Sequence, residues 1–437
     1  MMSFRRNITL IACLVALFTS VIANNEGRNK RWGTVPARKL TPRRNCTSPI
    51  TETRGGITRR LGISRPQKFQ TVWTWVLGPD GSLSWRDLGS TAGWQTYESA
   101  AFITAPEVLD VWASSQDLRV AFSIQAGTGH MMYLPYSGGK WVSDKWFDLG
   151  GRFVYRPATI SGTYGLSGVF GVNEDGELLY SALENEYLLP VTWTDWVLMG
   201  TGFTSEVAVG SSGRYTWEVV GIANGTYMHG LTDSSGSSPV WTDLGRPPNS
   251  VELGWPKVVA LSDFAGGGDD RGVVDVVVVA DGVAWHKYYD GTSWAEEWAR
   301  LPPSHDGLEI TNSQEFLVGF GSSVEPINPS NGYLFSRGSD ECVYQNQFGS
   351  SGYNQTTGQY EMEWKGWNNL WCPTDDDITA TDTQQSPLSI ATVAQYDNRF
   401  DFVIETPGGT LKHAQVYHDN GTFGGVVPNW VTLDGPP

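Results

Sequence analysis

The chain has 437 residues, of which only 17% are charged, whereas 51 are glycine and 20 are tryptophan. This length allows an ample core, and this composition favours short strands joined by tight turns over helices. The charge is unevenly divided: residues 28–68 contain twelve Lys or Arg and one acid, while residues 69–437 contain sixteen basic and forty-four acidic residues. So acidic a segment repels phosphate backbones, which excludes nucleic acid as an expected partner.

The amino terminus predicts export from the cell. Two arginines precede an apolar run at 8–22 that ends in small residues, so residues 1–23 are expected to be a secretory signal peptide. The run is too short for a membrane-spanning helix and no later segment reaches that length, so no membrane insertion is expected. Residues 24–66 are expected to be a basic, disordered leader. Within it, Lys30-Arg31 is either a processing site or part of a solvated basic patch.

Features typical of secreted proteins agree with this expectation. Asn-x-Thr sequons predict glycosylation at Asn45, Asn224, Asn354 and Asn420. Three cysteines follow the signal peptide, and a local disulfide between Cys342 and Cys372 is preferred, with Cys46 unpaired or bonded to an unidentified partner. Their spacing fits no metal site, and no metal or cofactor is expected. We therefore predict a secreted, extracellular glycoprotein.

One pattern recurs seven times through the rest of the chain. A tight turn is followed, four residues after its glycine, by an aromatic residue or histidine, which we call the anchor; Asp340 replaces the glycine in the sixth turn. The anchors are Trp85, Tyr133, Tyr180, His229, His286, Tyr344 and His413, and they lie 47 to 69 residues apart. An apolar strand precedes each anchor, a second apolar run lies upstream, and a tryptophan, often in Trp-x-x-Leu-Gly, follows. Each repeat therefore predicts four strands.

Repeated four-stranded units of this length predict an all-β fold of the β-propeller class. Each unit has two faces to bury, and packing neighbours around a ring covers both. Seven anchors favour seven blades within residues 67–437. Six blades plus a clasping hairpin are the alternative, because the first strand of the first repeat must come from a poor stretch at 55–66. Large, flat side chains are expected to wedge between adjacent sheets; these tail tryptophans are Trp94, Trp146, Trp196, Trp241, Trp298, Trp367 or Trp371, and Trp430.

The segment DGVAWHKYYDGTSWAEEWARLP combines an Asp-Gly turn, a Trp-His strand, a Gly-x-x-Trp turn and a final tryptophan. With the other repeats, it resembles seven-bladed bacterial propeller lectins of the Photorhabdus type, and the fungal fucose-binding lectins use a related six-bladed plan. The resemblance covers about residues 67–437. It implies sugar binding in shallow pockets lined by aromatic residues and histidine, with fucosylated or O-methylated glycans as partners.

Sugars suit the side chains of this repeat. A sugar stacks its apolar C–H face on Trp or Tyr, and its hydroxyls form hydrogen bonds with polar side chains. The expected sugar-binding residues are Trp285, His286, Tyr288, His229, Tyr227, His413, Tyr180, Tyr133 and Trp85. The alternative at each anchor is a side chain that packs against the next sheet. Repeats with tyrosine in place of histidine, such as those of Tyr180 and Tyr344, are candidates for lost ligand contact.

Catalysis is not expected. A propeller glycoside hydrolase needs two facing carboxylates, but most acids here occupy turns that favour Asp, and no Gly-x-Ser-x-Gly or His-Glu-x-x-His motif occurs. Asp269 and Asp270 suit either Ca²⁺ or, preferably, a flexible hairpin. We predict a secreted lectin; a glycoside hydrolase and a non-catalytic scaffold for protein partners are the alternatives. A lectin should expose several anchor aromatics, a scaffold should bury them, and an enzyme should have one cleft with clustered carboxylates.

Overall fold

The described part of the chain is all-β. The computed structural model describes residues 61–64, 73–88, 92–97, 101–110, 118–161, 167–185, 189–212, 216–233, 238–261, 272–301, 317–321, 331–337, 342–354, 359–371, 391–394, 399–405, 410–419, 422–423 and 431–433. The chain divides into two units, Met1–Gly55 and Gly56–Pro437, and every described residue lies in the second. Within these ranges no helix is long and apolar enough to span a membrane.

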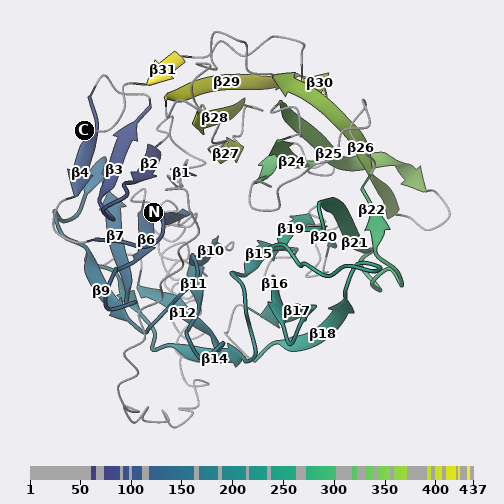
Figure 1. The fold of residues 1–437 in the computed structure, drawn as a ribbon, viewed down its shortest axis with the longest axis horizontal. Helices are drawn as coiled ribbons and strands as arrows, with labels where there is room; N and C mark the ends of the chain where they lie inside the picture. The colour runs from purple at the N-terminus through teal and green to yellow at the C-terminus, as the bar shows by residue number, and fades with distance from the viewer. Residues whose placement is uncertain are drawn as a thin grey trace, which may run out of the picture. The chain divides into compact units, whose positions relative to one another are not determined.

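The described strands form seven antiparallel sheets, numbered here in chain order (Figure 1). Sheet 1 contains β1 (Leu61–Ser64), β2 (Trp73–Leu77), β3 (Leu83–Asp87) and β4 (Gln95–Tyr97). Sheet 2 contains β5 (Glu107–Asp110), β6 (Arg119–Ile124), β7 (Met131–Ser137), β8 (Lys140–Trp141) and β9 (Phe147–Gly150). Sheet 3 contains β10 (Ala158–Ser161), β11 (Ser167–Val172), β12 (Leu178–Asn185), β13 (Thr192–Trp193) and β14 (Val197–Gly200). Sheet 4 contains β15 (Ala208–Ser211), β16 (Thr216–Ala223), β17 (Thr226–Asp233) and β18 (Val240–Gly245).

The remaining sheets follow the same order. Sheet 5 contains β19 (Lys257–Leu261), β20 (Val273–Ala280), β21 (Val283–Tyr289) and β22 (Ala299–Arg300). Sheet 6 contains β23 (Leu317–Gly321), β24 (Asn331–Arg337), β25 (Val343–Asn354) and β26 (Gln359–Trp371). Sheet 7 contains β27 (Ala391–Ala394), β28 (Arg399–Glu405), β29 (Leu411–Asp419), β30 (Thr422–Phe423) and β31 (Val431–Leu433). In sheets 2, 3 and 7 the fourth-strand position is split between two short strands that both pair with the third strand.

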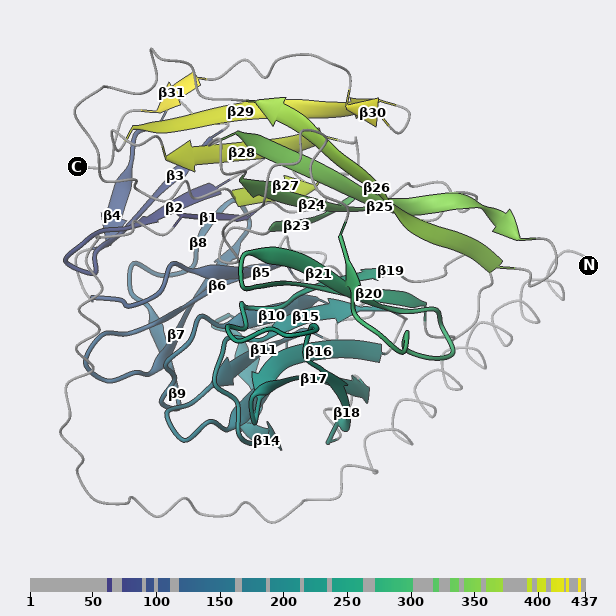
Figure 2. The ribbon, with the colours of Figure 1, turned by 45° about the vertical axis from the view of Figure 1, so that its right-hand side comes forward.

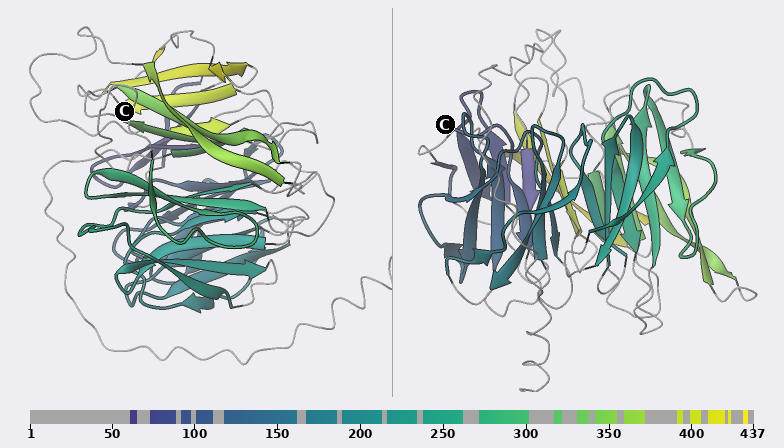
Figure 3. Two further views of the ribbon diagram at one scale, coloured as in Figure 1. Left: turned by 90° about the vertical axis from the view of Figure 1, so that its right-hand side faces the viewer. Right: turned by 90° about the horizontal axis from the view of Figure 1, so that it is seen from below.

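Neighbouring sheets contact one another through their first strands. β1 contacts β5, β5 contacts β10, and the contacts continue through β15, β19, β23 and β27, which returns to β1. The cycle of contacts is therefore closed, although every sheet is one continuous chain segment. Figures 2 and 3 show neighbouring sheets with their faces turned to one another. β25 and β26 also form a long hairpin that extends past the other strands of sheet 6 (Figure 2).

The first strand of sheet 1 comes from the expected leader. β1 pairs with β2 from Leu61↔Val76 to Ser64↔Trp73, and it lies inside residues 24–66. These four residues fall within the stretch at 55–66 from which the first strand of the first repeat was expected.

The turn glycines are confirmed where the structure describes them. Gly81, Gly129, Gly176, Gly225 and Gly282 all have φ between 72° and 82°, a left-handed conformation that is strained for other residues. Each closes the hairpin between the second and third strands of its sheet. The corresponding positions in sheets 6 and 7, Asp340 and Gly409, lie outside the described residues.

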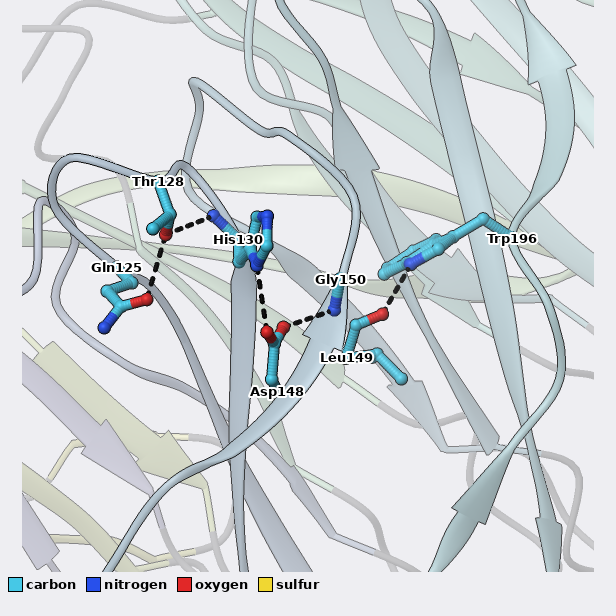
Figure 4. Close-up of polar contacts among 7 residues, drawn as sticks. All are labelled: Gln125, Thr128, His130, Asp148, Leu149, Gly150 and Trp196. Atoms are coloured by element: carbon cyan, nitrogen blue, oxygen red, sulfur yellow. Dashed lines mark hydrogen bonds and ion pairs between the residues drawn. The ribbon is translucent and has the colours of Figure 1, made fainter. Parts of the chain in front are cut away.

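Three of the tail tryptophans wedge between sheets with the same hydrogen bond, while Trp430 lies outside the described residues. In each case the indole Nε1 donates to a backbone carbonyl at the end of the preceding sheet: Trp196 to Leu149 at 3.0 Å (Figure 4), Trp241 to Met199 at 3.0 Å and Trp298 to Leu244 at 2.9 Å. The accepting residue belongs to the Trp-x-x-Leu-Gly element of the preceding repeat. The motif therefore supplies both the donor and the acceptor of the contact between consecutive sheets.

An aspartate fixes the end of this element in two sheets. The Asp148 carboxylate accepts a hydrogen bond from the Gly150 N–H at 2.7 Å (Figure 4), and the Asp243 carboxylate accepts one from the Gly245 N–H at 2.8 Å. Both glycines have φ above 70°, and both sit at a shift in strand register. Asp148 also binds the exposed His130 at 2.9 Å, so this carboxylate joins the second-strand turn to the last strand of sheet 2.

Candidate functional site

Most anchors face the next sheet along the chain, whereas Tyr344 packs in the cluster that sheet 6 shares with sheet 5. Four of the anchors lie edge-to-face against a tryptophan of the next sheet: Trp85 on Trp141, Tyr133 on Trp193, Tyr180 on Trp217 and His229 on Trp294, with ring centroids 5.6, 5.9, 5.3 and 4.9 Å apart. Edge-to-face geometry is the preferred arrangement for such pairs. The repeat thus places an aromatic or histidine of one sheet against an indole of its neighbour.

Most of the expected sugar-binding side chains are used in this packing. Tyr133, Tyr180, Tyr227, His229 and His413 are buried. The Tyr227 hydroxyl donates to the Gly254 carbonyl at 2.8 Å, and the Tyr133 hydroxyl donates to the Val191 carbonyl at 3.2 Å, both in the next sheet. A buried side chain offers no surface to a sugar, so a sugar-binding role for these five stays a prediction without support here. Trp85, Trp285, His286 and Tyr288 are partly exposed.

Trp285 and His286 do not act as a pair. Successive side chains of a strand point to opposite faces. Trp285 packs in the cluster shared with sheet 4, whereas Tyr288, on the same face as His286, packs in the cluster shared with sheet 6. The two neighbouring side chains therefore lie in different interfaces, and a sugar-binding role for each stays a separate prediction. Lys287, on the Trp285 face, donates to the Leu244 and Glu296 carbonyls at 3.0 and 3.1 Å.

The partly exposed histidine is held by a buried acid. His286 Nδ1 lies 2.9 Å from Oδ2 of Asp275, whose side chain is 0% exposed, whereas the His286 side chain is 20% exposed. The same oxygen accepts a hydrogen bond from Trp364 Nε1 of sheet 6 at 2.7 Å. Phe348 lies between two other rings, 5.8 Å from Tyr288 and 5.1 Å from Trp364. We call Asp275, His286, Tyr288, Phe348 and Trp364 the sheet 5–6 site.

Electrostatics favour the charged histidine at this site. Burial of the ring acts to lower the pKa of His286, but the charge of the Asp275 carboxylate and its hydrogen bond together outweigh burial and raise that pKa. The other carboxylate oxygen, Oδ1, is buried and has no hydrogen-bond partner among the described residues. Burial, followed by the charge of Asp275, raises the pKa of Tyr288, so its hydroxyl stays protonated and able to donate.

Sheet 4 has an equivalent histidine–carboxylate pair, but there the histidine is buried. Its anchor His229 contacts the buried carboxylate of Glu218 through Nε2, and Ser212 donates to the other oxygen of that carboxylate. Trp294 of sheet 5 covers the imidazole, so the His229 side chain is only 2% exposed. The histidine–carboxylate pair is therefore buried in sheet 4, whereas the histidine of the pair in sheet 5 is partly exposed.

Every sheet with a histidine anchor has an acidic residue at one fixed position on its second strand. Opposite each histidine anchor on the second strand is a valine, and two residues before that valine is an acid: Glu218 for His229, Asp275 for His286 and Asp401 for His413. At the same register position the four other sheets have Trp73, Val120, Gly168 and Leu334. Residues at this diagonal lie within reach of one another on one face. The sequence contained this signal, but it becomes visible only when the strands are aligned.

The remaining expected residues are placed as follows. Asn224 is exposed in the turn between β16 and β17, with φ 53°, and Asn354 ends β25. Cys342 is buried, while Cys372, Cys46, Asn45, Asn420 and the Asp269-Asp270 pair lie outside the described residues, so their roles stay predictions. In the described segments no group of three or more His, Cys, Asp or Glu side chains suits a metal ion.

Comparison with known proteins gives structural likeness alone. No protein-family model and no curated protein matches the chain. A mutant of the Aleuria aurantia lectin in complex with Fucα1-6GlcNAc is 14% identical, covers 74% of this chain and 98% of its own, and has a TM-score of 0.44. AofleA from Arthrobotrys oligospora is 8% identical, covers 87% of this chain and 88% of its own, and has a TM-score of 0.46.

A third neighbour limits what this likeness means. BBS1N in complex with ARL6DN is 11% identical, covers 84% of this chain and 95% of its own, and also has a TM-score of 0.46. The Aleuria aurantia lectin has a six-bladed β-propeller fold and is fucose-specific. Because all three TM-scores are below 0.5, the proposals below rest on the residues of this chain.

Proposed function

We propose that this protein is a secreted, non-catalytic lectin whose residues 61–433 form a seven-bladed β-propeller. Seven sheets, each a continuous segment, and the closed cycle of contacts between their first strands support the seven blades. The basic and apolar character of residues 1–23 and the four sequons support secretion.

A partly exposed imidazole among aromatic rings carries the lectin proposal. At the sheet 5–6 site His286 presents a polar ring edge and the partly exposed Tyr288 presents an aromatic face, while the buried Phe348 and Trp364 pack behind them. An imidazole binds hydroxyls as donor or acceptor, and aromatic faces stack on the apolar side of a sugar ring. This combination suits a neutral, polyhydroxylated ligand.

The burial of other anchors restricts the number of active sites. The buried anchors Tyr133, Tyr180 and His229 are enclosed by the next sheet, so the repeat does not provide seven equal sites. A single small site binds a monosaccharide weakly, and affinity for dense glycans comes from engaging several sites or several molecules at once. The sequence resemblance makes fucosylated and O-methylated glycans the first panel to test.

A glycan array with the full-length mature chain tests the proposal. His286→Ala should reduce the signal at least tenfold, because loss of one charge-assisted hydrogen bond costs roughly 1.5–3 kcal/mol. His229→Ala is the matched control: it removes an anchor of the same type that is closed to ligand, and it should leave the glycan preference unchanged. Equal losses in both variants would identify the histidines as structural, and a blank array with folded protein would reject the lectin proposal.

A scaffold for protein partners is the second candidate. The observation that favours it is the burial of five of the nine expected sugar-binding side chains. A glycoside hydrolase has less support, because the buried carboxylates of Glu218 and Asp275 lie in different interfaces and each binds a histidine. Hydrolysis by two carboxylates requires them to flank one glycosidic bond. A folded protein that binds no glycan would favour the scaffold function over the lectin function.

A further inference from the structure

The sheet 5–6 site binds one nitrogen of the His286 ring to the protein and leaves the other nitrogen for a ligand. Asp275 engages His286 at Nδ1, so Nε2 is the nitrogen available to a ligand on a side chain that is 20% exposed. The Asp275 carboxylate is fully buried and is also tied to Trp364 of the next sheet, so it cannot turn away without breaking that contact between sheets. A carboxylate on Nδ1 fixes the tautomer of the neutral ring with its proton on Nδ1.

Protonation then reverses what Nε2 offers. In the neutral ring Nε2 is only an acceptor, and it binds a ligand hydroxyl that donates. In the protonated ring Nε2–H is a charge-assisted donor, while Nδ1–H still bonds to Asp275. A sugar hydroxyl can serve both states, but the bond to the protonated ring is the stronger one.

We propose that Asp275 is a positioning residue that makes sugar binding at the sheet 5–6 site stronger in acid than at neutral pH. This inference rests on the proposed lectin function and adds its regulation. Charge-assisted hydrogen bonds contribute about twice the free energy of neutral ones, so affinity should fall about fivefold as His286 loses its proton. The same deprotonation leaves a buried carboxylate without a cationic partner, which lowers the stability of the folded protein.

The other charged groups near the site do not oppose this effect. On β26 the side chains that flank Trp364, Glu363 and Lys365, form an ion pair with each other at 2.7 Å. On β21 Tyr288 stays neutral, and Lys287 lies on the opposite face of the strand, bound to carbonyls. Asp275 is therefore the charge that acts on His286.

Calorimetric titration of the full chain across about pH 5 to 8 tests the inference. Methyl α-L-fucoside is the first probe, and the glycan with the highest array signal is the second. Wild type should lose affinity about fivefold toward neutral pH, whereas Asp275→Asn should bind equally weakly throughout. His229→Gln is the control and should keep the wild-type slope. Asp275→Glu should restore part of the slope, because the equivalent acid in sheet 4 is Glu218.

Nuclear magnetic resonance of the His286 ring separates the possible failures. The ¹⁵N shifts should report the Nδ1–H tautomer in the neutral state and a pKa above the ordinary value of 6.5, and the Trp364 indole signal should follow the same titration. Binding with no pH dependence, or with the same slope in Asp275→Asn, would overturn the inference and leave the lectin proposal intact. No glycan binding at any pH would overturn both.

Discussion

Substitution of Gly176 by alanine should destabilise the protein more than the same change at Gly282. The two glycines close equivalent turns and have nearly the same φ, 73° and 75°. Either substitution places alanine in a left-handed conformation, which costs about 1–2 kcal/mol. At Gly282 a new Cβ meets nothing within 4 Å, whereas at Gly176 it would lie 2.9 Å from the Phe203 carbonyl oxygen of the next sheet.

That carbonyl belongs to backbone that cannot move freely. The Phe203 N–H donates to the Gly176 carbonyl at 2.9 Å, so relief of the clash would strain this contact between sheets 3 and 4. Overpacking of this kind adds about 1–3 kcal/mol. Urea unfolding followed by tryptophan fluorescence should give a midpoint that falls further for Gly176→Ala than for Gly282→Ala at unchanged slope. Equal midpoints would refute the inference that this turn is packed tightly against the backbone of the next sheet.

Three further predictions address the packing and the site. Trp241→Phe keeps an aromatic ring but removes the hydrogen bond to the Met199 carbonyl, and it should lower the free energy of unfolding by about 1–3 kcal/mol in the same urea assay; no change would contradict a role for the indole N–H. Because the pKa of His286 is raised in the folded state, the contribution of this residue to stability should be complete below pH 6.5 and disappear as the pH rises through the raised pKa. Urea unfolding of wild type and His286→Gln across that pH range should therefore give midpoints that converge as the pH rises. Trp364→Phe should weaken glycan binding and lower the pKa of His286 only slightly, since the Asp275 contact remains; a fully normal His286 titration would mean that Trp364, and not Asp275, positions the ring.

Local chemistry explains what the sequence predicted well. The turn glycines were identifiable because a left-handed turn between two strands strongly favours glycine. The tail tryptophans were assigned to packing between sheets because no other place in a repeated β unit buries so large a ring. Trp196, Trp241 and Trp298 confirm that assignment with one shared hydrogen bond.

Contacts between sheets explain what the sequence did not predict. Trp294 of the following sheet covers His229, whereas Trp364 bonds to the Asp275 carboxylate beside His286, and residue spacing does not determine this difference. The separation of Trp285 from His286 followed from strand alternation and was missed because the two were treated as a motif. Asp275 and Glu218 were overlooked because their relation to the histidines requires the register of two strands.

The closing contact between sheets 7 and 1 gives the chain a particular order of assembly during synthesis. Each sheet is complete once its own segment has emerged, because no strand is borrowed from a distant part of the chain. The cluster of Val76, Val403, Leu411 and Leu433, with Trp94 against it, forms between sheets 7 and 1 and must wait for sheet 7, as must the contact between β23 and β27. A nascent chain that stops before sheet 7 would therefore carry six finished sheets and two uncovered apolar faces, the kind of surface that recruits chaperones or aggregates.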